Sequence, residues 1–91
     1  MSEYDLRYHP SAVDEINDLS KSIKERIQKS LTRLKEKPLE GKPLKGELAG
    51  FRSNRVGNYR IVYTVSSDQN IVYVLYVGHR SKVYEEAQRK L

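Results

Sequence analysis

The feature that most constrains the fold is the apolar run IVYVLYV, residues 71 to 77. It follows the polar turn SSDQN and ends at Gly78, which is typical of a β-strand that is apolar on both faces. Such a strand belongs at the centre of a sheet, because a half-exposed strand alternates apolar and polar residues. The run is far shorter than the roughly 20 residues that cross a bilayer. We therefore expect a sheet with residues 71–78 as its central strand.

The rest of the chain predicts the partners of that strand. Residues 3–9 alternate Tyr and Leu with charged residues, and residues 52–57 and 58–66 have strand-like composition. Between them, apolar residues recur at helical spacing from Pro10 to Leu19 and from Ile23 to Leu34, and Pro38 ends the second helix. Residues 81–90 indicate a short C-terminal helix or tail. The order predicts an α+β fold: an N-terminal strand, an αα-hairpin, and a mostly antiparallel four-stranded sheet whose second face is open to water or a partner.

Length and composition restrict the class of protein. With 91 residues and no cysteine, the chain is expected to form one domain, residues 1–91, without disulfides or a thiolate metal site. The N-terminal residues MSEYDLRYHP lack the apolar stretch of a secretory signal. We expect a cytoplasmic protein without a membrane anchor.

The charge distribution indicates a polyanionic partner. The chain carries a net charge of +5, and residues 21–45 hold nine Lys or Arg against three Glu. A cationic face of this kind favours nucleic acid, although basic helices are also common as solvated surfaces.

Arginines in the predicted sheet are the first candidate site residues. Period-two alternation puts Arg60 with Val62 on one face of its strand, and on the last strand it groups Tyr76 and Gly78 with Arg80. Arg60 and Arg80 can therefore meet on one face, and Arg52 and Arg55 can join the same basin from the neighbouring strand. Converging guanidiniums suit a phosphodiester, although one strand arginine is more often an ordinary surface or ion-paired residue.

Two further groups are candidates for proton transfer. Tyr84 lies four residues after Arg80 and is interpreted as a packing anchor, a base-stacking platform or a proton-transfer group. His79 adjoins Arg80 and is a possible general acid or base. His9 and His79 are far apart and no Gly-rich loop precedes a helix, so we expect neither a metal site nor a nucleotide cofactor.

Three segments of the sequence, which contain these candidate residues, resemble a known family. The segments HPSAVDEINDL, LKGELAGFRSNRVGNYRIVY and VLYVGHRSKVYEEA resemble toxins of the RelE/ParE superfamily from toxin–antitoxin pairs over nearly the full length. The ending GHR…VY is more similar to the RelE branch than to ParE. The resemblance implies the RelE-like fold, which is also described as microbial RNase-like.

The same resemblance implies a function. It predicts a ribosome-dependent, metal-independent endoribonuclease, an mRNA interferase that cuts mRNA in the ribosomal A site by attack of a 2′-hydroxyl on the adjacent phosphate. It implies inhibition of translation by a toxin that a RelB-like antitoxin neutralises. By this resemblance Arg60 and Arg80 contact phosphate, Tyr84 is the general base and His79 takes part in proton transfer. The predicted RNA-binding residues are Arg52, Arg55, Lys45, Lys29 and Arg33.

Two departures leave other functions open. Arg52 and Arg55 stand where the family has lysines, and arginine cannot exchange its proton near neutral pH. The segment from Arg80 to Tyr84 is also shorter than in RelE toxins. The alternatives are a ParE-like inhibitor of DNA gyrase and a catalytically degenerate protein that only binds its antitoxin or RNA.

Overall fold

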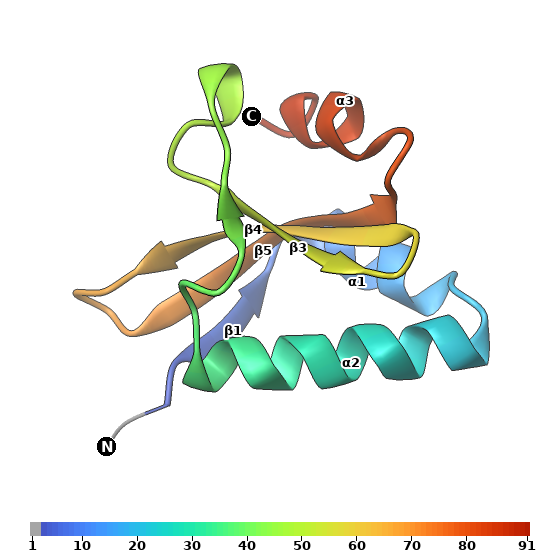
Figure 1. Ribbon diagram of the computed structural model, residues 1–91, viewed down its shortest axis with the longest axis horizontal. Helices are drawn as coiled ribbons and strands as arrows, with labels where there is room; N and C mark the ends of the chain where they lie inside the picture. The colour runs from blue at the N-terminus through green and yellow to red at the C-terminus, as the bar shows by residue number, and fades with distance from the viewer. Residues whose placement is uncertain (1–2) are drawn as a thin grey trace.

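The computed structural model describes residues 3–91 and has a five-stranded sheet with helices on both faces (Figure 1). The strand order is β1-β5-β4-β3-β2, in which β1 is parallel to β5 and every other neighbouring pair is antiparallel. The elements are β1 (Asp5–Tyr8), α1 (Pro10–Asn17), α2 (Lys21–Glu36), β2 (Lys42–Pro43), the 3-10 turn η1 (Gly46–Leu48), β3 (Arg52–Val56), β4 (Tyr59–Ser66), β5 (Ile71–His79) and α3 (Val83–Gln88).

The predicted α+β class is confirmed, with one more strand than expected. The segment from α2 to β3, residues 37–51, is called here the connector. It contributes β2, a two-residue strand that pairs Lys42 with Ser53 and Pro43 with Arg52. Short polar strands of this kind give little sequence signal, because two residues show no alternation. The expected αα-hairpin is present and packs on one face, where α1 contacts β5 and α2 contacts β1 and β3.

The central position of β5 is confirmed, but its faces change partway along the strand. The register passes from Tyr63↔Val74 to Val62↔Tyr76, so Leu75 is an extra residue in a β-bulge. Val74 and Val77 consequently both face the helical hairpin, whereas Leu75 and Tyr76 face the other side. The predicted uninterrupted alternation along this strand is wrong, because a bulge shifts the phase by one residue.

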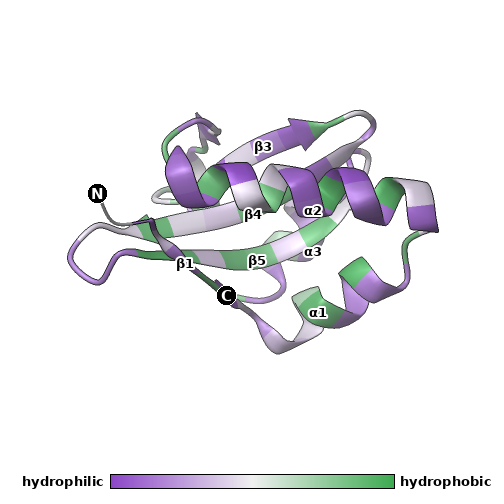
Figure 2. Cartoon of the chain, turned by 90° about the horizontal axis from the view of Figure 1, so that it is seen from below, coloured by the Kyte–Doolittle hydropathy of each residue, from purple (hydrophilic) through white to green (hydrophobic). Residues whose placement is uncertain are grey.

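The main core lies between the sheet and the helical hairpin. Figure 2 shows hydrophobic positions recurring along α2, which packs over the sheet. Buried members of this core come from both helices and three strands: Ala12, Ile16, Ile27, Leu31, Leu34, Val56, Ile61, Tyr63, Val72, Val74 and Val77. The predicted helical stripe from Ile23 to Leu34 therefore forms the inner face of α2.

The opposite face of the sheet is partly covered rather than open. Leu48, Val62, Leu75, Val83 and Ala87 form a second, smaller core beneath α3 and η1. Figure 1 shows α3 and the connector on one side of the sheet, with α1 and α2 on the other. The expectation that this face is open is therefore wrong where α3 and η1 cover it. The part of the face that stays uncovered lies between α3 and the connector.

Within residues 3–91, no helix combines the length and apolarity that crossing a membrane requires.

Candidate active site

Arg60 lies on the sheet face that carries α3. It pairs with Arg55 across β3 and with Gly78 across β5, and its neighbour Val62 belongs to the second core. Its Nε atom is buried and has no hydrogen-bond partner among residues 3–91. An unpartnered buried donor on a cation is costly, so Nε is an unfavourable feature of the free protein at this position.

Arg60 opens into a groove of about 570 Å³, called here the Arg60 groove. The strand supplies the arginine, the connector supplies the two lysines, and α3 supplies two polar side chains. None of the lining residues, which all belong to the described part of the chain, carries a carboxylate. They are Lys42, Pro43, Leu44, Lys45, Leu48, Arg60, Tyr84 and Gln88.

Tyr84 and Gln88 reach the Arg60 groove because they are four residues apart on α3 and share one face of that helix. Val83 and Ala87 are fully buried in the second core and anchor the helix. Tyr84 is 40% exposed, so its phenol is open to a substrate. The structure thus brings together Arg60, Tyr84 and Lys45, three of the site residues expected from the sequence.

The connector that carries Lys42 and Lys45 is held from the other side of the sheet. The buried Tyr63 hydroxyl donates to the Pro38 carbonyl at 2.8 Å and accepts from the Gly41 N–H at 2.9 Å. Burial is the main cause of the raised pKa of Tyr63, so the phenol remains protonated as this bonding requires. These bonds set where the connector begins its return across the sheet.

Arg52 belongs to this support and not to the Arg60 groove. Its Nη1 donates to the carbonyls of Leu39 at 3.1 Å and Gly41 at 2.8 Å. It pairs with Tyr63, which faces the helical hairpin, so it lies on the opposite face from Arg60. Arg55 does share the face of Arg60, as expected. Arg52 cannot join a basin with Arg60, because residues three apart on a strand point to opposite faces. Arg55 shares the face of Arg60 without lining the Arg60 groove.

Arg80 and His79 lie at the end of β5. Arg80 is exposed, its backbone N–H donates to the Asn58 carbonyl at 2.8 Å, and its side chain forms no ion pair within residues 3–91. His79 pairs with Tyr59 and meets its ring edge-on at 5.6 Å, on the face of the helical hairpin. Its Nδ1 accepts the Ser81 N–H at 3.2 Å, which leaves the proton of the neutral ring on Nε2. The structure does not bring His79 to the Arg60 groove.

The two basic residues predicted on α2 lie on the other side of the sheet. Arg33 forms an exposed ion pair with Glu40 at 2.9 Å. Lys29 lines a surface hollow of about 490 Å³ with Glu25, Gln28 and Thr32. They can form only a second surface, separate from the Arg60 groove.

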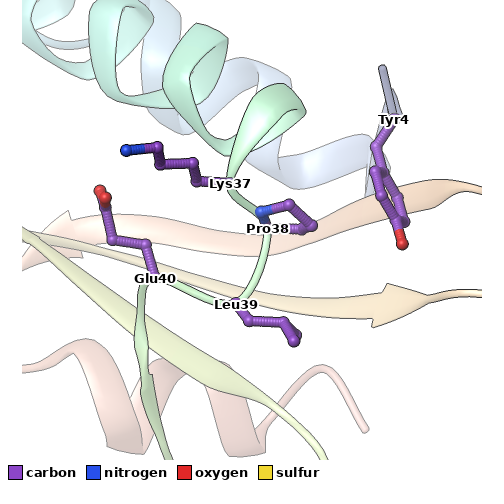
Figure 3. A pocket seen from close by; sticks show the side chains of 5 residues that line it. All are labelled: Tyr4, Lys37, Pro38, Leu39 and Glu40. Carbon is purple, nitrogen blue, oxygen red and sulfur yellow. The ribbon is translucent and has the colours of Figure 1, made fainter. Parts of the chain in front are cut away.

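A third hollow, of about 450 Å³, lies beside the connector (Figure 3). Pro38 and Leu39 lie on the side of the loop that faces Tyr4, while the side chains of Lys37 and Glu40 extend to the other side. Leu39 is 62% exposed. The hollow is mainly apolar, and the two charged side chains in its lining form no ion pair with each other, so we assign it no chemistry.

Lys42 and Gln88 are groove residues that the sequence interpretation missed. The spacing of Tyr84 and Gln88 offered a signal, since i and i+4 positions share a helix face. Lys42 offered none, because its position depends on how the connector folds back over the sheet.

Comparison with known proteins gives the family. Residues 6–84 match the family model described as the ParE toxin of the type II toxin–antitoxin system parDE. The chain belongs to this family of toxins.

Curated relatives of the chain include toxins named RelE and RelG. The chain is 32% identical over 92 aligned residues to the mRNA interferase toxin RelE of Escherichia coli, covering 97% of both chains. It is 44% identical over 52 residues to the toxin RelG of Mycobacterium tuberculosis, which covers 56% of this chain and 60% of RelG. The predicted resemblance to RelE/ParE toxins is confirmed.

Solved structures of RelE toxins share the fold of this chain. A chain of the toxin–antitoxin complex RelBE2 from Mycobacterium tuberculosis superposes with a TM-score of 0.80 at 34% identity, covering 89% of this chain and 95% of that one. The isolated E. coli RelE toxin superposes with a TM-score of 0.75 at 30% identity, covering 96% and 97%. The RelE-like fold expected from the sequence is confirmed.

Proposed function

We propose that this chain, as a single toxin domain over residues 1–91, is an mRNA endoribonuclease that acts on the ribosome and inhibits translation in the cytoplasm. The observation that carries the proposal is that Arg60 lines a groove together with two lysines and an exposed tyrosine. The full-length likeness to an mRNA interferase supports the same reaction.

The groove suits in-line attack within RNA. The 2′-oxygen attacks the adjacent phosphorus, the bond from phosphorus to the 5′-oxygen breaks, and a 2′,3′-cyclic phosphate remains. Negative charge builds on the phosphoryl oxygens. The guanidinium of Arg60 and the ammonium groups of Lys42 and Lys45 supply positive charge that stabilises it. Stabilising that charge is typically the largest single contribution to such a reaction.

Proton transfer falls to Tyr84 in this proposal. The 2′-hydroxyl loses a proton as it attacks, and the 5′-oxygen gains one as it leaves. Tyr84 is the exposed hydroxyl that lines the Arg60 groove, and in its phenolate form it takes the first proton. The leaving 5′-oxygen takes its proton from solvent water, because the groove is open to solvent. His79 faces the other side of the sheet and would need a rearrangement of the β5 end to take part. Arg80, exposed at that end, adds a phosphate contact, and Arg80→Ala should cut cleavage by orders of magnitude while the fold survives.

Larger charged surfaces would hold the partners. Lys29 and Arg33 lie on α2, on the opposite face of the sheet from the Arg60 groove, so they can contact ribosomal RNA while the groove holds mRNA. The net charge of +5 favours an acidic antitoxin, and the relatives of known structure include RelBE toxin–antitoxin complexes. A stoichiometric complex with a small acidic protein should form and block cleavage.

The test is cleavage of labelled mRNA with and without ribosomes whose A site is empty. A cut within the A-site codon only when ribosomes are present supports the proposal. An intact message, with folding confirmed by circular dichroism, contradicts it.

A gyrase inhibitor is the second candidate, because the matching family model is that of ParE toxins. A supercoiling assay with purified DNA gyrase separates the two functions. Inhibition of supercoiling together with an intact message would favour the ParE-like function. Binding to the antitoxin with neither activity would indicate a degenerate toxin.

A further inference from the structure

The Arg60 groove is lined by two chemically different kinds of side chain. Lys42, Lys45 and Arg60 supply cationic donors, which suit phosphate oxygens. Pro43, Leu44 and Leu48 supply apolar surface, which a sugar–phosphate backbone does not need. A groove of about 570 Å³ is within the size range of small-molecule sites, and it has room for a base as well as its phosphate.

Gln88 is the group that fits a base edge. It and Tyr84 are the two uncharged polar side chains among the lining residues. A glutamine amide presents two N–H donors and a carbonyl acceptor side by side, the pattern that pairs with a nucleobase edge. Phosphate offers acceptors alone, so it would leave the carbonyl of this amide unused.

The neighbouring charges of α3 leave Gln88 free for this contact. Arg89 bonds to Glu85 at 3.2 Å and to Glu86 at 2.8 Å, so these charged side chains pair with one another and not with Gln88. The side chain of Gln88 forms no hydrogen bond within residues 3–91, and the residue is exposed at the last helical position. Its amide is therefore free to bond to a ligand in the Arg60 groove.

We propose that Gln88 reads a nucleobase flanking the scissile phosphate and so determines which codons are cut. The proposal rests on the proposed endoribonuclease function and adds a specificity residue to its site. The apolar wall formed by Pro43 and Leu44 contacts the face of the base, while the amide bonds to its edge. Single-stranded RNA is commonly recognised in this way, by a surface against the base and hydrogen bonds to its edge.

The test compares cleavage rates across ribosomes programmed with a set of A-site codons, for the wild type, Gln88→Leu and Gln69→Leu. Leu keeps helix propensity, so Gln88→Leu should fold normally. Gln69 lies in the β4–β5 turn outside the groove lining, so Gln69→Leu is a matched loss of an exposed amide. We expect Gln88→Leu to narrow the ratio between the best and worst codons by about tenfold, with Gln69→Leu unchanged.

Each other outcome overturns a specific claim. An unchanged codon profile in Gln88→Leu, or an equal slowing at every codon, overturns the role of Gln88 while the endoribonuclease function stands. Equal cleavage of all codons by the wild type also overturns the role of Gln88 and leaves the endoribonuclease function standing. If the wild type cuts no codon, the proposed function fails and the role of Gln88 fails with it.

Discussion

Arg55 and Arg60 lie directly opposite each other across the β3–β4 hairpin, on the sheet face that carries the Arg60 groove. Neither forms an ion pair within residues 3–91. Like charges at opposed positions destabilise a sheet. An anion bound between them would relieve the repulsion, which is consistent with a phosphate-binding role for this pair.

Replacing Arg55 should therefore stabilise the free protein. We expect Arg55→Gln to raise the free energy of unfolding by about 0.2–1 kcal/mol, measured by urea denaturation at low salt. The same substitution should weaken RNA binding and reduce its salt dependence, because one phosphate contact is lost. Lower stability of Arg55→Gln at low salt would show that the two arginines do not repel each other in the folded state.

Tyr63 supports the groove without lining it. Tyr63→Phe leaves the buried Gly41 N–H without its acceptor and frees the Pro38 carbonyl, so the free energy of unfolding should fall by about 1–3 kcal/mol. Because the connector carries Lys42, cleavage should also slow while Arg60 and Tyr84 remain. Denaturation and single-turnover assays of the same preparation check both effects, and full activity with unchanged stability would argue against this support.

Alkaline pH should destabilise the fold. Burial raises the pKa of Tyr8, Tyr63 and Tyr76 above the ordinary value of 10.0. The folded protein then holds phenolic protons that the unfolded chain releases. This contribution to stability is complete below about pH 10 and is lost as the pH rises through the higher folded values. Urea midpoints should fall between pH 9 and pH 11, and Tyr63→Phe should make the decline shallower; a flat profile would contradict this.

Lys90 and Glu15 join the C-terminus to α1 around the edge of β5. Lys90 Nζ lies 2.5 Å from Glu15 Oε2 and donates to the Leu75 carbonyl at 3.0 Å, while Glu15 Oε1 accepts the Val77 N–H at 3.2 Å. These bonds satisfy backbone groups of β5 beyond the end of β1. Lys90→Met leaves a largely buried carboxylate without its cation, so we expect a loss of about 1–3 kcal/mol in unfolding free energy.

A double-mutant cycle isolates this ion pair. Glu15→Gln retains an acceptor for Val77 but removes the charge that Lys90 needs. The two substitutions should therefore be non-additive, with a coupling energy above about 0.5 kcal/mol. Strict additivity would mean that Lys90 and Glu15 do not stabilise each other in the folded protein.

The sequence predicted the face of Arg60 but not its full surroundings. Alternation along residues 58–66 was uninterrupted, so the placement of Arg60 beside Val62 followed directly. The same rule separates Arg52 from Arg55, yet the interpretation of the strands placed both in one basin. The bulge at Leu75 could not be predicted from alternation, because both faces of that strand are apolar and either phase fits.

The ending of the chain was harder to predict. Residues 81–90 were expected as a short helix or tail, and the second core beneath them depends on Leu48, which comes from a connector without periodicity. The contribution of Lys42 to the Arg60 groove arises in the same way. Contacts between segments far apart in sequence decided these features.

The most direct test of the account is the single-turnover rate of A-site cleavage by the wild type, Arg60→Gln and Arg7→Gln. Arg7 is an exposed arginine on β1 outside the Arg60 groove, so Arg7→Gln removes the same charge as a control. We predict that Arg60→Gln slows cleavage by about 100-fold or more, as loss of a transition-state donor does, with folding and the Arg7→Gln rate unchanged. A rate for Arg60→Gln near that of the wild type, or an equal loss in Arg7→Gln, would contradict the assignment of the Arg60 groove as the active site.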